Sequence, residues 1–297
     1  MNNKQILFFV GILAFVIGCS SEGKRLKTDG GYEYQIVRKG SADAIPVNSY
    51  VFFNMDLVYK DSMIQSGADS PQRPVIKIVA EKKDYGYFTS LVDLIGKMHE
   101  GDSFLYYFPV DSFDQKPPGF EKFTEPLVYR VGIMEVMDEA AFQKYSDSLQ
   151  QAQEAVRQAV RDRLPAIEAL TKSNWEAYKK GALNAQLQTA SSGLKYIIHE
   201  AGDGPKPAMG EQVSVHYYGM LDSDATMFDN SFSHGQPYVF PLGVGQVIQG
   251  WDEGLMLLNK GSKATLFIPS AMGYGAAGSP PKIPENADLI FYVELGK

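Results

Sequence analysis

The stretch Val213-Ser-Val-His-Tyr-Tyr-Gly-Met-Leu221 alternates apolar and polar residues over its first half, as a β-strand with one buried face does. Asp222-Ser-Asp224 follows as a turn signal, and a further strand is expected toward Phe228. Downstream, Trp251, Leu255 and Leu258 are spaced as neighbours on one face of a helix. This short helix is expected to stop at Lys260-Gly261.

Two more alternating segments close the chain. Leu266 and Ile268 form the first, and the second runs from Leu289 to Leu295 with apolar residues at every other position. Several strands with a single short helix favour an α+β fold, in which an antiparallel β-sheet wraps around the helix. We place this domain at residues 190–297.

The same order of elements is expected a second time, upstream. Four residues recur 162 positions later. The apolar residues of the opening stretch and of the last strand also have counterparts at this spacing upstream. These four matched pairs are Gly31 with Gly193, Tyr34 with Tyr196, Ile36 with Ile198, and Gly40 with Gly202. The recurrence predicts a second copy of the fold at residues 30–137.

Residues 138–185 between the copies predict a helical linker. No Gly or Pro occurs from 138 to 164, and Asp138 is a suitable N-cap. Pro165 should end this helix near Leu164, and a second helix should run from about Ala166 to Lys180. The narrow apolar stripe of the second helix favours packing on the chain's own domains, and the alternative is a spacer or a partner surface.

The first residues predict export. Lys4 precedes the twelve-residue apolar stretch Ile6–Ile17, which is too short to span a bilayer as a permanent helix. Val16-Ile-Gly-Cys19 is similar to the bacterial lipobox, in which the cysteine is lipidated. We therefore expect a signal peptide at 1–18, a lipid on Cys19 and a tether at 19–29. Lipid anchorage in a bacterial cell envelope follows, at the outer membrane facing the periplasm because Ser20 follows the cysteine. The alternative is a cleaved signal with an incidental cysteine.

Composition excludes several classes of function. A net charge of −7 without any basic stripe argues against nucleic-acid binding. The four histidines are scattered, and Cys19 is the only cysteine, so neither a metal nor a cofactor is expected. No Gly-x-Ser-x-Gly stretch exists from which a hydrolase triad could start.

Five motifs, taken in order, identify the carboxy-terminal domain by resemblance. Besides the opening stretch, they are Met227-Phe-Asp-Asn-Ser231, Gly245-Gln-Val-Ile-Gln-Gly-Trp251, Gly273-Tyr-Gly-Ala-Ala-Gly278 and Ile283-Pro-Glu-Asn-Ala-Asp-Leu-Ile-Phe291. Together they resemble the FKBP family of peptidyl-prolyl cis/trans isomerases, and the resemblance covers about 105 residues. The resemblance implies a pocket that binds proline-containing polypeptides and macrolides of the rapamycin type.

Carried over position by position, the resemblance assigns eleven residues to this pocket. Trp251 would form the floor under the proline ring, while the Ile248 N–H and the Tyr274 hydroxyl would hold peptide carbonyls. Tyr238 and Lys282 depart from the family's usual Phe and aliphatic residue. The implied catalytic residues are Tyr217, Phe228, Asp229, Trp251, Tyr274 and Phe291, and the implied substrate-binding residues are Tyr238, Phe240, Val247, Ile248 and Ile283.

Each assignment has an alternative. The aromatic residues could fill a core, and Asp229 could cap a turn instead of bonding to Tyr217. At the protein level, the leading hypothesis is an isomerase that assists the folding of exported proteins, and the alternative is a non-catalytic envelope chaperone or interaction lipoprotein. By analogy with some family members, the linker helices could also form a homodimer.

The amino-terminal copy lacks the pocket chemistry. Met55 stands for Tyr217 and Leu91 for Trp251, with Tyr87-Phe88 in the place of Val247-Ile248. We therefore expect residues 30–137 to be a degenerate FKBP-like domain with a structural or partner-binding role.

Overall fold

The computed structural model describes residues 24–297 except 41–42, 70–72, 82, 111–115 and 117–118. The chain divides between Ser146 and Asp147 into two compact units, unit 1 before this point and unit 2 after it. The signal segment expected at 1–18 and the lipidation site expected at Cys19 lie outside the described residues. Within the described part of the chain, no helix has the length and apolar character needed to cross a membrane.

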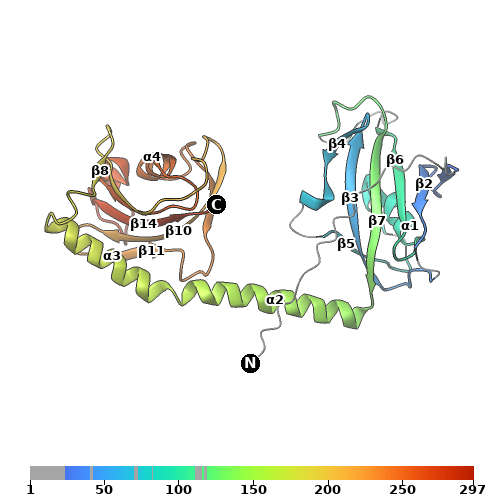
Figure 1. The fold of residues 1–297 in the computed structure, drawn as a ribbon, viewed down its shortest axis with the longest axis horizontal. Helices are drawn as coiled ribbons and strands as arrows, with labels where there is room; N and C mark the ends of the chain where they lie inside the picture. The colour runs from blue at the N-terminus through green and yellow to red at the C-terminus, as the bar shows by residue number, and fades with distance from the viewer. Residues whose placement is uncertain (1–23, 41–42, 70–72, 82, 111–115, 117–118) are drawn as a thin grey trace. The chain divides into compact units, whose positions relative to one another are not determined.

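Unit 2 is an antiparallel sheet with one helix on each face (Figure 1). The strands lie in the order β11-β10-β14-β13-β9-β8, and β12 also pairs with β10. Helix α4 (Gln249–Leu257) lies on one side of the sheet and α3 (Leu164–Lys179) on the other. The strands are β8 (Gln188–Thr189), β9 (Lys195–Glu200), β10 (Gln212–Leu221), β11 (Met227–Asn230), β12 (Tyr238–Pro241), β13 (Lys263–Ile268) and β14 (Leu289–Leu295).

The α4 face of the sheet carries the residues that the alternation predicts. Val213 and Val215 of β10 pack with Leu266 of β13 and with the helix residue Leu255. Each of these side chains is at most 4% exposed, because every second residue of a strand points to the same face. The strand and helix periodicities therefore predicted this core.

The opposite face is buried as well, under α3. Ile167 packs against Tyr218 and Tyr292, while the ring of Tyr178 stacks on Phe267 at 4.1 Å between centroids. The Trp175 indole N–H donates to the Asp222 carbonyl at 3.0 Å. Strands β13 and β14 are consequently buried on both faces, whereas alternation alone predicted a strand with one buried face. The second linker helix thus packs on the chain's own sheet, as its narrow apolar stripe favours.

Unit 1 has the same connectivity. Its sheet runs β1-β2-β6-β7-β3-β4 with β5 also on β3, which is the order of unit 2 read from the other edge. Its helix α1 (Thr89–Ile95) buries Leu91, Leu94 and Ile95. The strands are β1 (Leu26–Lys27), β2 (Glu33–Arg38), β3 (Tyr50–Tyr59), β4 (Ser62–Gln65), β5 (Val75–Lys77), β6 (Ser103–Phe108) and β7 (Leu127–Met137).

Helix α2 (Glu139–Arg161) begins where the sequence predicts. The Asp138 carboxylate accepts the Ala141 N–H at 2.7 Å, as an N-cap does. Phe142 stacks on the Tyr50 ring at 3.6 Å and so attaches the start of the helix to unit 1. The segment predicted as a linker, 138–185, is therefore shared between the units, since the start of α2 packs on unit 1 and α3 packs on unit 2.

The buried face of α3 yields a stability prediction. Ile167→Ala should lower the free energy of unfolding of unit 2 by about 2–3 kcal/mol, because Ile167 is buried and its truncation leaves a cavity. The transition can be followed by tryptophan fluorescence in urea, since Trp175 and Trp251 both lie in unit 2. The matched control is Leu170→Ala on the same helix, where the side chain is 40% exposed. Equal losses for the two variants would contradict the packing described.

Candidate active site

Aromatic rings surround the indole of Trp251 in unit 2. The Tyr217 ring meets it edge to face at 5.0 Å between centroids, and the Phe291 ring does so at 5.2 Å. The Phe240 ring lies tilted at 5.8 Å, and Phe228 packs edge-on against Phe291 at 5.4 Å. Edge-to-face contacts set the electropositive edge of one ring against the electronegative face of another. Strands β10, β11, β12 and β14 together thus place four rings about one helix residue.

A glycine makes this approach of rings feasible. Gly219 on β10 lies against the rings of Phe228 and Phe291, and a Cβ built there would be 2.7 Å from Phe291 and 2.8 Å from Phe228. Contacts that short do not occur between carbon atoms, so any side chain at this position would displace both rings.

Tyr217 and Asp229 form a half-buried polar pair beside the rings. The Tyr217 hydroxyl donates to Oδ2 of Asp229 at 2.6 Å, and Oδ1 accepts the Asn230 N–H at 2.9 Å. Burial raises the pKa of the Tyr217 phenol well above its usual range, and its bond to the Asp229 carboxylate raises that pKa further. The tyrosine–carboxylate bond predicted from the sequence is therefore present, and the phenol stays protonated at neutral pH.

The loop between β12 and α4 is held by the first turn of that helix. The Asp252 carboxylate accepts the Gly243 N–H at 2.8 Å and the Gly245 N–H at 2.9 Å. Ile248 ends the loop as the N-cap of α4 and, with Val247, packs on the core around Trp251. Asp252 was not among the residues predicted for the site. An acid in the first turn of a helix is a visible sequence signal for a carboxylate that accepts N–H groups near the helix start.

The rim is formed by more exposed groups. Tyr238 stacks on Phe240 at 5.1 Å and remains 42% exposed, while Tyr274 is 40% exposed. Burial raises the pKa of Tyr274, as does the charge of the Asp229 carboxylate. Ile283 is buried in the same core and forms an isolated antiparallel β-bridge with Ser279. The eleven residues predicted for the site therefore lie in unit 2 around Trp251 or at the edge of its cluster.

The matching place in unit 1 has a different composition. Leu91 of α1 is buried there, and the Phe88 ring stacks on Phe108 at 5.5 Å and meets Tyr129 edge to face at 5.8 Å. Met55 is the residue of β3 that corresponds to Tyr217 of β10. Bulky rings thus pack in the core around α1, and the part of unit 1 that the structure describes has neither a tryptophan nor a tyrosine–carboxylate pair at this place.

The site carries aromatic surface and protonated hydroxyl groups. Among the described residues, no cluster of three or more His, Cys, Asp or Glu side chains could hold a metal ion. Such a site suits recognition of an apolar ring that is flanked by carbonyl groups.

Comparison with known proteins places the chain in a family. The family model of FKBP-type peptidyl-prolyl cis-trans isomerases matches residues 204–296, which hold the whole ring cluster. The isomerase FPR2 of Saccharomyces cerevisiae is 50% identical over 90 residues, 30% of this chain and 67% of that protein. This chain belongs to the FKBP-type peptidyl-prolyl cis-trans isomerase family.

Two further relatives show how far the likeness extends. The chain is 52% identical to mouse FKBP2 over 92 residues, which are 31% of this chain and 65% of that protein. A probable FKBP-type isomerase FkpA of Neisseria meningitidis serogroup B is 43% identical over 127 residues, 42% of this chain and 46% of that protein. The chain thus spans between about half and two thirds of these relatives.

The support that Asp252 gives to its loop can be tested by ligand binding. Asp252→Asn should raise the Kd for a proline-containing peptide about tenfold, because the amide has a single acceptor oxygen and leaves one of the two N–H groups facing an NH2 donor. Isothermal titration calorimetry on the full chain measures this. Glu253→Gln is the matched control, since the Glu253 side chain bonds to Ser192 and not to the loop. A Kd that is unchanged in Asp252→Asn would contradict the role given to this carboxylate.

Proposed function

We propose that unit 2 accelerates the cis/trans isomerisation of X–Pro bonds in polypeptides. The observation that carries the proposal is the ring cluster around Trp251. The Trp251 side chain is 5% exposed, and Phe240 connects it to the rim residue Tyr238, which is 42% exposed. The family membership and the residues matched within 204–296 support the same activity.

The chemistry asks for no bond to be broken. Rotation about a peptide bond faces a barrier of about 18–20 kcal/mol because of amide resonance. For X–Pro bonds, rotation takes on the order of tens to hundreds of seconds unaided. A site that binds the twisted amide better than either planar form lowers this barrier. An acceleration of three to six decades requires roughly 4–8 kcal/mol of such preference.

The site residues divide this work. The indole of Trp251 and the rings of Phe228 and Phe291 would hold the pyrrolidine ring and exclude water, which otherwise stabilises the planar, dipolar amide. Among the described residues, no acceptor contacts the Ile248 N–H, which is therefore open to a peptide carbonyl. The protonated hydroxyl of Tyr274 would donate to a second carbonyl.

Setting and partners form the second part of the proposal. The export signal and Cys19 would place the protein on a lipid anchor in a bacterial envelope, facing the periplasm at the outer membrane, where exported proteins fold. Unit 1 would then serve as a degenerate FKBP-like copy with a structural or client-binding role. Leu149 and Val156 of α2 are 44% and 65% exposed, and they would meet their counterparts in a homodimer.

A proline-limited refolding reaction tests the activity. The full chain should accelerate it at substoichiometric amounts, and Trp251→Leu should reduce the acceleration at least about tenfold, since an aliphatic floor loses the indole surface. A macrolide of the rapamycin type should abolish it. Leu170→Ala serves as the control on the far face of the sheet. If the full chain only suppresses aggregation and leaves the slow phase unchanged, the non-catalytic chaperone hypothesis replaces this one.

The pH dependence follows from the two phenols. Burial holds the pKa of Tyr217 and Tyr274 above the usual value of 10.0, so both hydroxyl groups keep their protons as the pH rises toward that value. We expect kcat/KM to stay constant between about pH 7 and pH 9. A stopped-flow assay with a proline peptide across this range measures it. A fall in kcat/KM centred below pH 9 would show that a phenol of the site ionises early.

A further inference from the structure

Ser231 forms hydrogen bonds with the backbone of Tyr217. Strand β10 pairs with β12 over Gln212–Val215 and with β11 from Tyr218 onward. Between these contacts the ladder has a gap. There the Ser231 Oγ accepts the Tyr217 N–H at 2.8 Å, and the Ser231 N–H donates to the Tyr217 carbonyl at 3.0 Å. One residue thus satisfies both backbone groups of the tyrosine whose hydroxyl binds Asp229.

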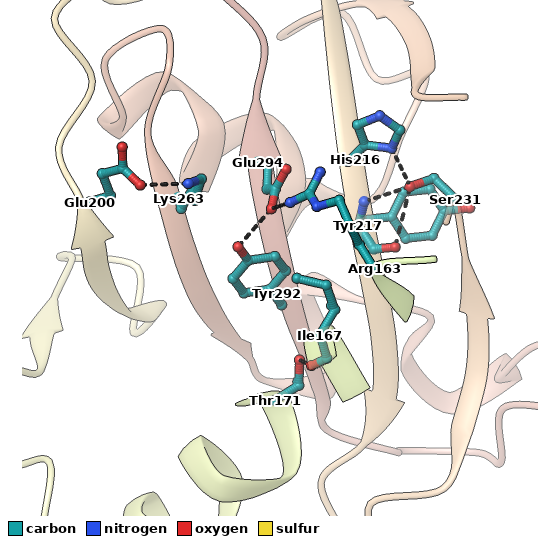
Figure 2. A network of polar contacts seen from close by, with 10 residues as sticks. All are labelled: Arg163, Ile167, Thr171, Glu200, His216, Tyr217, Ser231, Lys263, Tyr292 and Glu294. Carbon is teal, nitrogen blue, oxygen red and sulfur yellow. Dashed lines mark hydrogen bonds and ion pairs between the residues drawn. The ribbon is translucent and has the colours of Figure 1, made fainter. Parts of the chain in front are cut away.

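A stack of side chains supports Ser231 in turn. Nδ1 of His216 lies 3.0 Å from the Ser231 Oγ (Figure 2). The His216 ring stacks on Phe232 at 5.2 Å between centroids. The guanidinium of Arg163 lies over the same Phe232 ring, 5.3 Å from its centroid. Ser231 and Phe232 are at most 2% exposed, whereas the Arg163 side chain is 42% exposed, so the stack runs from the protein interior at Ser231 to the surface at Arg163.

Arg163 belongs to the linker and is itself fixed. It is the N-cap residue of α3, and its guanidinium forms an ion pair with the Glu294 carboxylate of β14 (Figure 2). The Tyr292 hydroxyl donates to the same carboxylate at 2.8 Å. The N-cap residue of the linker helix α3 therefore contacts both Glu294 of β14 and the ring of Phe232 through its guanidinium.

The protonation state of His216 fits the hydrogen bonds. Burial lowers the pKa of His216, the neighbouring Arg163 lowers it as well, and the Glu294 carboxylate opposes them. A neutral His216 ring can accept the Ser231 hydroxyl proton at Nδ1 in one tautomer, and the Tyr217 carbonyl is a second acceptor for that hydroxyl at 3.4 Å. In either case the Ser231 Oγ accepts the Tyr217 N–H.

We propose that Arg163 is a positioning residue for the isomerase site, acting through Phe232, His216 and Ser231 on Tyr217. The inference rests on the proposed isomerase function of unit 2. Placement of the phenol matters because the ring of Tyr217 packs against Trp251 while its hydroxyl bonds to Asp229. Loss of the contacts that hold Ser231 would leave the aromatic rings near one another but would displace the Tyr217 side chain from its place in the site.

A double-mutant cycle in the full chain tests this coupling. Arg163→Met should lower kcat/KM for a proline peptide about fivefold, and Ser231→Ala about tenfold. If Arg163 acts through Ser231, the double variant should lie within about twofold of Ser231→Ala alone, since the second change removes what the first disturbs. Arg163→Lys should be intermediate, because an ammonium pairs with Glu294 but presents no planar face to Phe232. Lys172→Met, which removes an exposed charge from the same helix, is the control and should match the wild type.

All variants are compared well below their unfolding midpoints, with folding checked by near-ultraviolet circular dichroism. Effects of Arg163→Met and Ser231→Ala that multiply in the double variant would overturn the proposal. So would an Arg163→Met protein that unfolds more easily but keeps the wild-type kcat/KM, because that result describes a structural role only. A wild-type chain without isomerase activity would instead remove the proposed function, and this inference with it.

Discussion

The packing of Tyr217, Phe240 and Phe291 around the indole of Trp251 is the constraint on which the structure of unit 2 depends. Three strands must reach one helix residue at ring-to-ring distances of 5.0–5.8 Å. A sheet that was free to slide on either face would not keep such distances. Burial under α4 on one face and α3 on the other fixes β10 and β14, because each of these two strands has side chains packed on both faces. Strand β12 is held by its pairing with β10.

The two units show how one connectivity can carry different chemistry. Both sheets have the same strand order, and both wrap a short helix. In unit 2 the helix offers an indole and the neighbouring strands offer a tyrosine bonded to a carboxylate, whereas in unit 1 the helix offers Leu91 among large rings. The fold thus provides a place for a pocket, and the side chains at that place decide whether a ligand can enter.

Much of this arrangement could be predicted from the sequence, because it depends on local periodicity and on motifs. The alternation in β10 and β14 and the spacing of Trp251 and Leu255 are short-range patterns, and the second copy of the fold is found by the recurrence after 162 residues. The burial of Phe267 under Tyr178 could not be predicted in this way, since it depends on how a helix returns to a sheet. The support of Tyr217 by Ser231 was also missed, because it arises at a gap in strand pairing that no periodicity marks. For Asp252, the first-turn acid was a visible signal, but the loop that it holds was not.

The central claim is that a water-poor enclosure of rings favours the half-rotated imide over both planar forms. Magnetisation-exchange NMR of a proline peptide, recorded with and without a catalytic amount of the full chain, tests it most directly. We expect the cis-to-trans and trans-to-cis rates to rise by the same factor with the cis:trans ratio unchanged, and Trp251→Leu to lose most of that rise. Peptide resonances that broaden or shift on binding while the interconversion rates stay at their uncatalysed values would contradict the account.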